Sequence, residues 1–101
     1  MLIADVDTVY VPQIEDCIEH DQSIEAVNVW DGFGRFYDRK FAIAECYRLA
    51  STALTDHRYD IPKGHHHAVA LCVYHVCNGE QTIQDCIDIV PNVEQEGVCN
   101  V

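Results

Sequence analysis

The sequence is poor in basic side chains, and two long segments of it have none. The chain of 101 residues carries six Lys and Arg against 17 Asp and Glu, a formal net charge of −11 at pH 7. Residues 1–34 and 64–101 contain no Lys or Arg, so every such charge lies between Arg35 and Lys63. A field of this sign repels nucleic acid and anionic membranes and attracts basic protein surfaces. We therefore expect no direct contact with nucleic acid or with a membrane.

The sequence also lacks a secretion signal and a long apolar run. The first residues, MLIADVD, have no basic region and are interrupted by acids. The longest apolar run, residues 68–74, is far shorter than the roughly 20 residues that span a bilayer. These features predict a cytoplasmic protein whose six cysteines are mostly free thiols. The hydrophobic fraction of 49% is that of a folded chain, so we expect one domain over residues 1–101.

No motif of a known catalytic or phosphate-binding type is present. The tetrapeptide Asp-Gly-Phe-Gly at 31–34 lacks the spacing and the Lys of a phosphate-binding loop, and it predicts a turn. A reactive cysteine needs a positive neighbourhood, and only Cys46 has one, from Arg48. Side chains two positions apart on a helix diverge, so this support is poor. We therefore expect no enzymatic activity.

The cysteines and histidines offer one weak metal site. Two Cys-x-x-His pairs would each share a helix face and together form a tetrahedral zinc ligand set: Cys17, His20, Cys72 and His75. A chain with six Cys and six His contains such spacings by chance. The favoured interpretation is therefore buried thiols with histidines at their rim, and no cofactor. The run His65–His67 cannot share one helix face and predicts solvated surface.

The N-terminal half predicts a short sheet. Residues 2–11 are rich in β-branched side chains and predict a strand. Pro12 then suits the first turn of a short helix that ends near residues 20–22. Residues 24–30 predict a second strand, and the turn at 31–34 returns the chain into a third strand at 35–37.

The C-terminal half predicts helices. Asp38 is a good N-cap for a long helix over 39–56, on which the following residues trace a stripe: Phe41, Ala44, Tyr47 or Arg48, Ser51 and Leu54. Residues 65–77 favour a buried helix, although Val69, Val73 and the Asn78-Gly79 turn signal also allow a strand. A short helix over 83–90 would stop at Pro91, and a tail follows with a short strand at 98–101. The expected fold is therefore a small single α+β domain, in which an N-terminal antiparallel three-stranded sheet is covered by a C-terminal helical half.

Charge is the feature that points to a function. A compact acidic domain can occupy the basic groove of a nucleic-acid-binding complex, with its carboxylates in the place of phosphates. Small acidic inhibitors of restriction or CRISPR machinery, encoded by viruses and mobile elements, act on such targets, and the comparison rests on size and charge alone. The densest acidic segment supplies the expected contacts with the partner: Glu15, Asp16, Glu19 and Asp21. Phe33, at the expected turn, would add an apolar anchor.

Two alternatives stay open. The Cys and His residues could serve a metal-binding or redox-sensing module. The chain could also be an oligomeric structural subunit, in which the apolar residues 68–77 contribute to an interface between copies.

Overall fold

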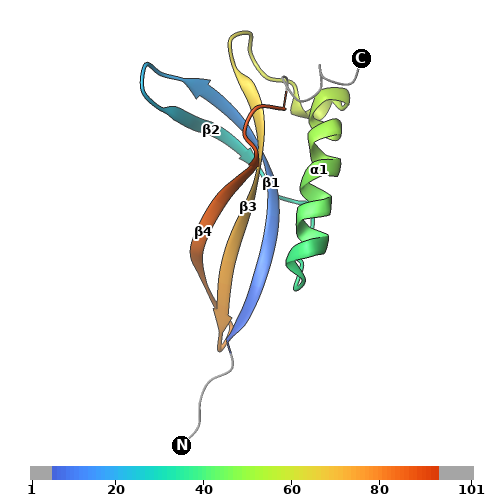
Figure 1. Ribbon diagram of the computed structural model, residues 1–101, viewed down its shortest axis with the longest axis vertical. Helices are drawn as coiled ribbons and strands as arrows, with labels where there is room; N and C mark the ends of the chain where they lie inside the picture. Colours follow the sequence, from blue (N-terminus) through green and yellow to red (C-terminus); the bar gives the residue numbers. More distant parts are fainter. Residues whose placement is uncertain (1–5, 94–101) are drawn as a thin grey trace, which may run out of the picture.

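A four-stranded antiparallel sheet packs against one α-helix in this computed structural model, which describes residues 6–93 (Figure 1). The helix lies in the middle of the chain, between two pairs of strands. In chain order the elements are β1 (Asp7–Glu19), β2 (Ile24–Trp30), α1 (Arg39–Thr55), the 3₁₀ turn η1 (His57–Tyr59), β3 (His66–Cys77) and β4 (Glu80–Val90).

The strand order is β2-β1-β3-β4, so the two longest strands lie in the centre. β1 and β2 form one hairpin, β3 and β4 form the other, and α1 with η1 connects them. The register places Ile14 opposite Val69 and Cys72 opposite Cys86. Figure 1 shows α1 running along one face of the sheet, and among residues 6–93 no helix covers the other face. We call this second face the open face.

The helix predicted from Pro12 onward is wrong, because β1 continues through this residue to Glu19. Tyr10 exchanges two backbone hydrogen bonds with Phe36. Phe36 thus lies along the edge of β1 that pairs with β2 further along the strand. Pro12 follows two residues after Tyr10 and faces the same side, but β2 pairs with β1 only from Ile14 onward. A proline without an N–H is therefore tolerated in a central strand, because no partner strand needs that donor here.

The helices predicted at 65–77 and 83–90 are also wrong, since these segments form β3 and β4. Asn78 and Gly79 turn the chain with φ values of 54° and 81°, the left-handed conformation that a tight hairpin turn requires. β3 is the third of the four strands, and its first half, residues 67–72, is buried on both faces. A strand buried on both faces has no polar alternation, and its sequence resembles that of a buried helix.

The predicted fold class is therefore wrong in its arrangement. The described residues contain four strands rather than three, and the α-helix precedes the second pair of strands instead of following the sheet. The predicted strand at 35–37 is reduced to a single bridge between Tyr10 and Phe36. The predicted strand at 98–101 lies outside the described residues, as does the start of the strand predicted at 2–11.

Two predicted elements are confirmed. β2 has the predicted bounds, and α1 begins after Asp38, whose side chain accepts a hydrogen bond from the backbone N–H of Lys40. The stripe expected on this helix is not the side that packs. α1 instead buries a row of small and aliphatic side chains at helical spacing: Ala42, Cys46, Leu49 and Ala53.

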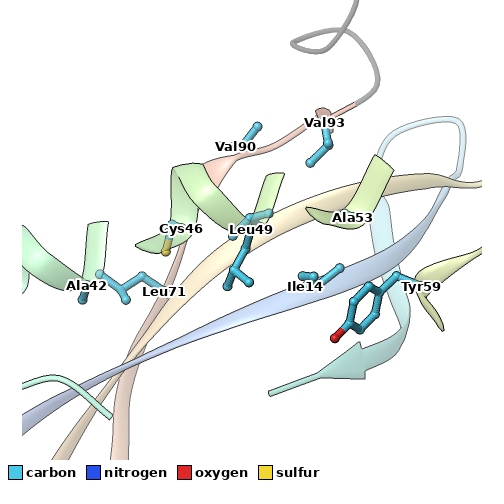
Figure 2. Packing of buried hydrophobic residues seen from close by; sticks show 10 residues of the cluster. Ile14, Ala42, Cys46, Leu49, Ala53, Tyr59, Leu71, Val90 and Val93 are labelled. Atoms are coloured by element: carbon cyan, nitrogen blue, oxygen red, sulfur yellow. The ribbon is translucent and has the colours of Figure 1, made fainter. Parts of the chain in front are cut away.

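The core lies between α1 and the covered face of the sheet (Figure 2). Leu49 of α1 is in the same buried cluster as Ile14 of β1 and Leu71 of β3, and all three are fully buried. Trp30 lies edge-on to Tyr59 with ring centroids 5.4 Å apart, which connects β2 to η1. In the part of the chain that the structure describes, no helix combines the length and apolar character that crossing a membrane requires.

Candidate protein-binding surface

The open face is built from the alternate residues of each strand. Ile14 and Leu71 belong to the core on the covered face, so their neighbours in sequence point to the open face. Several residues at these alternate positions of β1 and β3 are buried, yet lie outside the core cluster: Val9, Val11, Cys17, Ala68, Ala70 and Cys72. The centre of the open face is therefore apolar and made largely of small side chains.

The two edge strands expose larger apolar side chains beside this centre. On β2, Ile24 is 57% exposed and Val29 is 44% exposed, and on β4 Ile83 is 55% exposed. The register aligns them with open-face positions, because Val29 is opposite Glu15 and Ile83 is opposite Tyr74. An apolar sheet face that no helix covers is typical of a surface that contacts another molecule.

Two carboxylates lie within the open face. Glu15 is 9% exposed and accepts a hydrogen bond from Gln13 Nε2 at 2.8 Å. Asp88 is exposed on β4, opposite Ala70. Burial raises the pKa of Glu15, the hydrogen bond from Gln13 opposes this shift, and the negative charge of Asp88 adds to it. An apolar surface that contains carboxylates favours a partner that brings positive charge.

The described residues contain one disulfide and three free cysteines. Cys72 and Cys86 are directly opposite on β3 and β4 and form a disulfide, which differs from the expectation of mostly free thiols at these two positions. Cys17, Cys46 and Cys77 are free. Burial, together with the charge of Glu15, raises the pKa of Cys17 to about 11, so this thiol stays protonated and unreactive near neutral pH.

The structure divides the predicted contact cluster. Glu15 and Asp16 lie on opposite faces of β1, and both are buried. Asp16 accepts a 2.7 Å hydrogen bond from His65 Nδ1 on the covered side. Glu19 and Asp21 are exposed and lie at or just beyond the end of β1, next to the hairpin. Phe33 is partly buried and packs against Tyr59, with ring centroids 5.8 Å apart.

One carboxylate of the open face was not among the predicted contact residues. Asp88 comes to the open face because residues 83–90 form a strand and not a helix. Glu25 of β2 is opposite Ile18, so it lies on the other face of the sheet, and it bonds His20 Nε2 at 2.9 Å. The alternation of Asp88 with Ile87 and Ile89 could have indicated that β4 is a strand.

The weak zinc candidates do not form a site. Each Cys-x-x-His pair needed a helix, whereas Cys17 lies in β1 and the pair Cys72 and His75 lies in β3. Residues three apart on a strand point to opposite faces. Within residues 6–93, no group of three or more His, Cys, Asp or Glu side chains is arranged to hold a metal ion.

The histidine run serves the local packing at the start of β3. His65 bonds Asp16, and His67 Nε2 bonds the backbone oxygen of Tyr59. His66 lies opposite Cys17, and its buried Nε2 makes no hydrogen bond within the described residues. The expected solvated patch is thus half-buried to buried in the structure.

Charge is segregated between the sheet and the helical side of the molecule. None of the four strands contains a Lys or Arg. The basic side chains belong to residues 35–63, where Arg48 pairs with Glu45 and Arg58 pairs with Asp56. The guanidinium of Arg58 lowers the pKa of Asp56 to about 2, so this pair is charged over the whole neutral range. The exposed carboxylates of the strands therefore have no Lys or Arg neighbour within the strands, although Lys63 lines the same hollow as Glu19.

The edges of the sheet are protected against the addition of another strand. On β2, Asn28 Oδ1 accepts the backbone N–H of Val29, and on β4 Asp85 Oδ1 accepts the backbone N–H of Cys86. Register irregularities occur in both outer pairings. Bulges, edge charges and occupied backbone donors all disfavour edge-to-edge pairing. Contacts with a partner are therefore expected through side chains rather than through an added strand.

Comparison with protein-family models, with curated proteins and with solved structures gives no match to this chain. The assignment of a function thus depends on the geometry and charge described above.

Proposed function

We propose that this chain is a small acidic protein-binding inhibitor or regulator, which occupies the basic surface of a nucleic-acid-binding complex. The observation that carries the proposal is the charge segregation: four strands without a Lys or Arg present exposed carboxylates beside exposed apolar side chains. Such a surface complements a groove that binds phosphates. An anti-defence inhibitor of restriction or CRISPR machinery is one protein of this class.

The exposed hairpin carboxylates are the proposed first contacts. Glu19 and Asp21 are exposed and have no ion pair within the described residues. Glu15 and Asp16 are buried and form hydrogen bonds inside the molecule, with Gln13 and His65. We therefore assign the partner-binding role among the predicted residues to the first pair.

The test is capture of partners from a lysate of the cells that produce the protein. The immobilised chain is washed at low salt and then at high salt, and the eluates are identified by mass spectrometry. The proposal predicts a nucleic-acid-binding protein that is released as salt rises, since ionic contacts are screened. Retention of the partner at high salt, or capture of nothing, would contradict it.

A matched pair of variants separates local contacts from bulk charge. Glu19→Lys with Asp21→Lys should weaken capture strongly. Glu94→Lys with Glu96→Lys makes the same change in net charge near the C-terminus. Equal losses in both variants would show that net charge alone governs capture.

The disulfide favours a second candidate function, a redox-sensing module. Cys72 and Cys86 lie on the open face, so their oxidation state affects the surface proposed to bind a partner. This candidate predicts that a dithiol reductant changes partner capture in the wild type and not in a Cys72→Ser, Cys86→Ser variant. Capture that is identical with and without reductant would exclude it.

A further inference from the structure

The outer side of α1 is the second exposed apolar surface of the molecule. Tyr37, Phe41 and Tyr47 are 72%, 64% and 60% exposed, which is unusual for three aromatic side chains so close in sequence. Leu54, near the end of the helix, is also exposed. These side chains lie away from the core, because α1 buries Ala42 and its row on the opposite side.

Positive charge accompanies these aromatic side chains. Arg39 and Lys40 begin the helix, are exposed, and have no ion pair within the described residues. We call the whole set the helix surface: Tyr37, Arg39, Lys40, Phe41, Tyr47 and Leu54. It is apolar and basic, whereas the open face is apolar and acidic.

From this complementarity we infer that the protein associates with itself head to tail, with the helix surface of one copy docked on the open face of a second copy. Val29 and Ile83 supply the exposed apolar contacts on the open face. Asp88 is the exposed carboxylate of this face, near Glu15, and it faces the basic side chains of the incoming helix. The two unpartnered surfaces thus cover each other, and charges of opposite sign meet.

The symmetric alternatives are disfavoured by charge. Two open faces packed together would place two copies of Glu15 and Asp88 in one apolar interface. The neighbouring carboxylates already disfavour ionisation of Glu15 in a single copy, so a second pair adds repulsion. Two helix surfaces packed together would bring two copies of Arg39 and Lys40 into one interface without a partner of opposite charge from the helix surface.

The geometry has a consequence for the size of the assembly. α1 packs on one face of the sheet and the open face is the other (Figure 1). A head-to-tail contact leaves one free surface at each end of a pair, so further copies add until a ring closes or the protein is diluted. This inference does not rest on the proposed function, but both use the open face, so a bound partner and a second copy would compete for it.

Two variants each disable one of the two surfaces. Arg39→Glu with Lys40→Glu reverses the helix surface, and the fold should tolerate this because acids are favourable in the first turn of a helix. Asp88→Lys reverses the charge of the open face beside Glu15. Glu80→Lys is the control, with the same change in charge at an exposed position of the same strand, opposite Cys77.

The experiment is sedimentation of each protein over a range of concentrations at low salt. The wild type and the control should show a mass that rises with concentration, and each disabled variant should stay monomeric. An equimolar mixture of the two disabled variants should form a one-to-one complex and nothing larger, because one intact helix surface meets one intact open face. The dissociation constant should rise by at least about tenfold for each variant alone.

Three results would overturn the inference. The first is a wild type that is monomeric at all concentrations, and the second is a mixture of the two disabled variants that stays monomeric. The third is self-association that the open-face variant abolishes and the helix-surface variant does not, with no complex formed when the two are mixed. The last result would indicate a symmetric contact between open faces. Partner capture by the monomeric variants is then measured separately, so failure of self-association does not bear on the proposed function.

Discussion

Glu15 shows at the scale of one residue how burial and charge conflict on the open face. Its carboxylate is held by Gln13 within an apolar surface and near a second carboxylate. Because the folded state raises its pKa, the folded protein binds this proton more tightly than the unfolded chain does. The stabilisation by the proton is complete below the ordinary glutamate pKa and is lost as pH rises through the raised value.

Glu15→Gln should therefore raise the free energy of unfolding near pH 7 relative to the wild type, and the gain should vanish near pH 3.5. The amide removes the cost of a buried charge and can still accept the hydrogen bond from Gln13. Urea denaturation at the two pH values measures this difference. Glu25→Gln, at an exposed position, is the control and should show no gain at pH 7. A destabilised Glu15→Gln at pH 7 would contradict the account.

Reduction of the Cys72–Cys86 disulfide should lower the free energy of unfolding by about 3 kcal/mol. The bond closes a loop with a sequence separation of 14, and its loss returns conformational entropy to the unfolded chain. Denaturation with and without a dithiol reductant gives the value. Cys77→Ser, at a free thiol, should respond to reductant as the wild type does. A wild type unaffected by reductant would show that this bond does not stabilise the protein.

At the scale of the elements, α1 holds the two hairpins together through its buried row. Leu49 is fully buried at the centre of the core (Figure 2), so Leu49→Ala should cost about 2–5 kcal/mol of stability. Tyr47, two positions away, is 60% exposed, and Tyr47→Ala should change stability by about 0.5 kcal/mol or less. Thermal and urea unfolding of both variants test the orientation of the helix. Equal costs would mean that the exposed stripe also packs.

The β3–β4 hairpin depends on its turn. Gly79 has a φ of 81°, so Gly79→Ala should cost about 1–2 kcal/mol through backbone strain, although nothing lies within 4 Å of the added Cβ. Gly32 has equal space for a Cβ and no positive φ, so Gly32→Ala is the matched control and should be tolerated. A hairpin that tolerates both changes equally would contradict the left-handed turn.

Local signals account for the elements that the sequence predicts correctly. Asp38 caps α1, and β2 is bounded by turn residues, so both could be placed without knowledge of the fold. Pro12 misled the prediction for β1, because its tolerance depends on where β2 ends. The first half of β3 is buried on both faces, and only the pairing of strands distinguishes this segment from a buried helix. The open face could not be predicted for the same reason, since its residues come from all four strands.

The whole molecule is organised by the separation of charge. The net charge of −11 resides mainly on the sheet, and most of its carboxylates have no basic neighbour. Repulsion among them opposes folding, so added sodium chloride should raise the free energy of unfolding at pH 7. Urea denaturation across a salt series tests this. Stability that falls or stays constant with salt would contradict a surface dominated by repulsion.

The central claim is that the acidic sheet occupies a nucleic-acid-binding surface, and displacement tests it most directly. Labelled nucleic acid is bound to the captured partner at low salt, and its release is followed by fluorescence anisotropy as the protein is added. The account predicts complete release by the wild type, and release that needs at least about tenfold more of the Glu19→Lys, Asp21→Lys variant. A ternary complex, in which the partner holds the protein and the nucleic acid together, would contradict it.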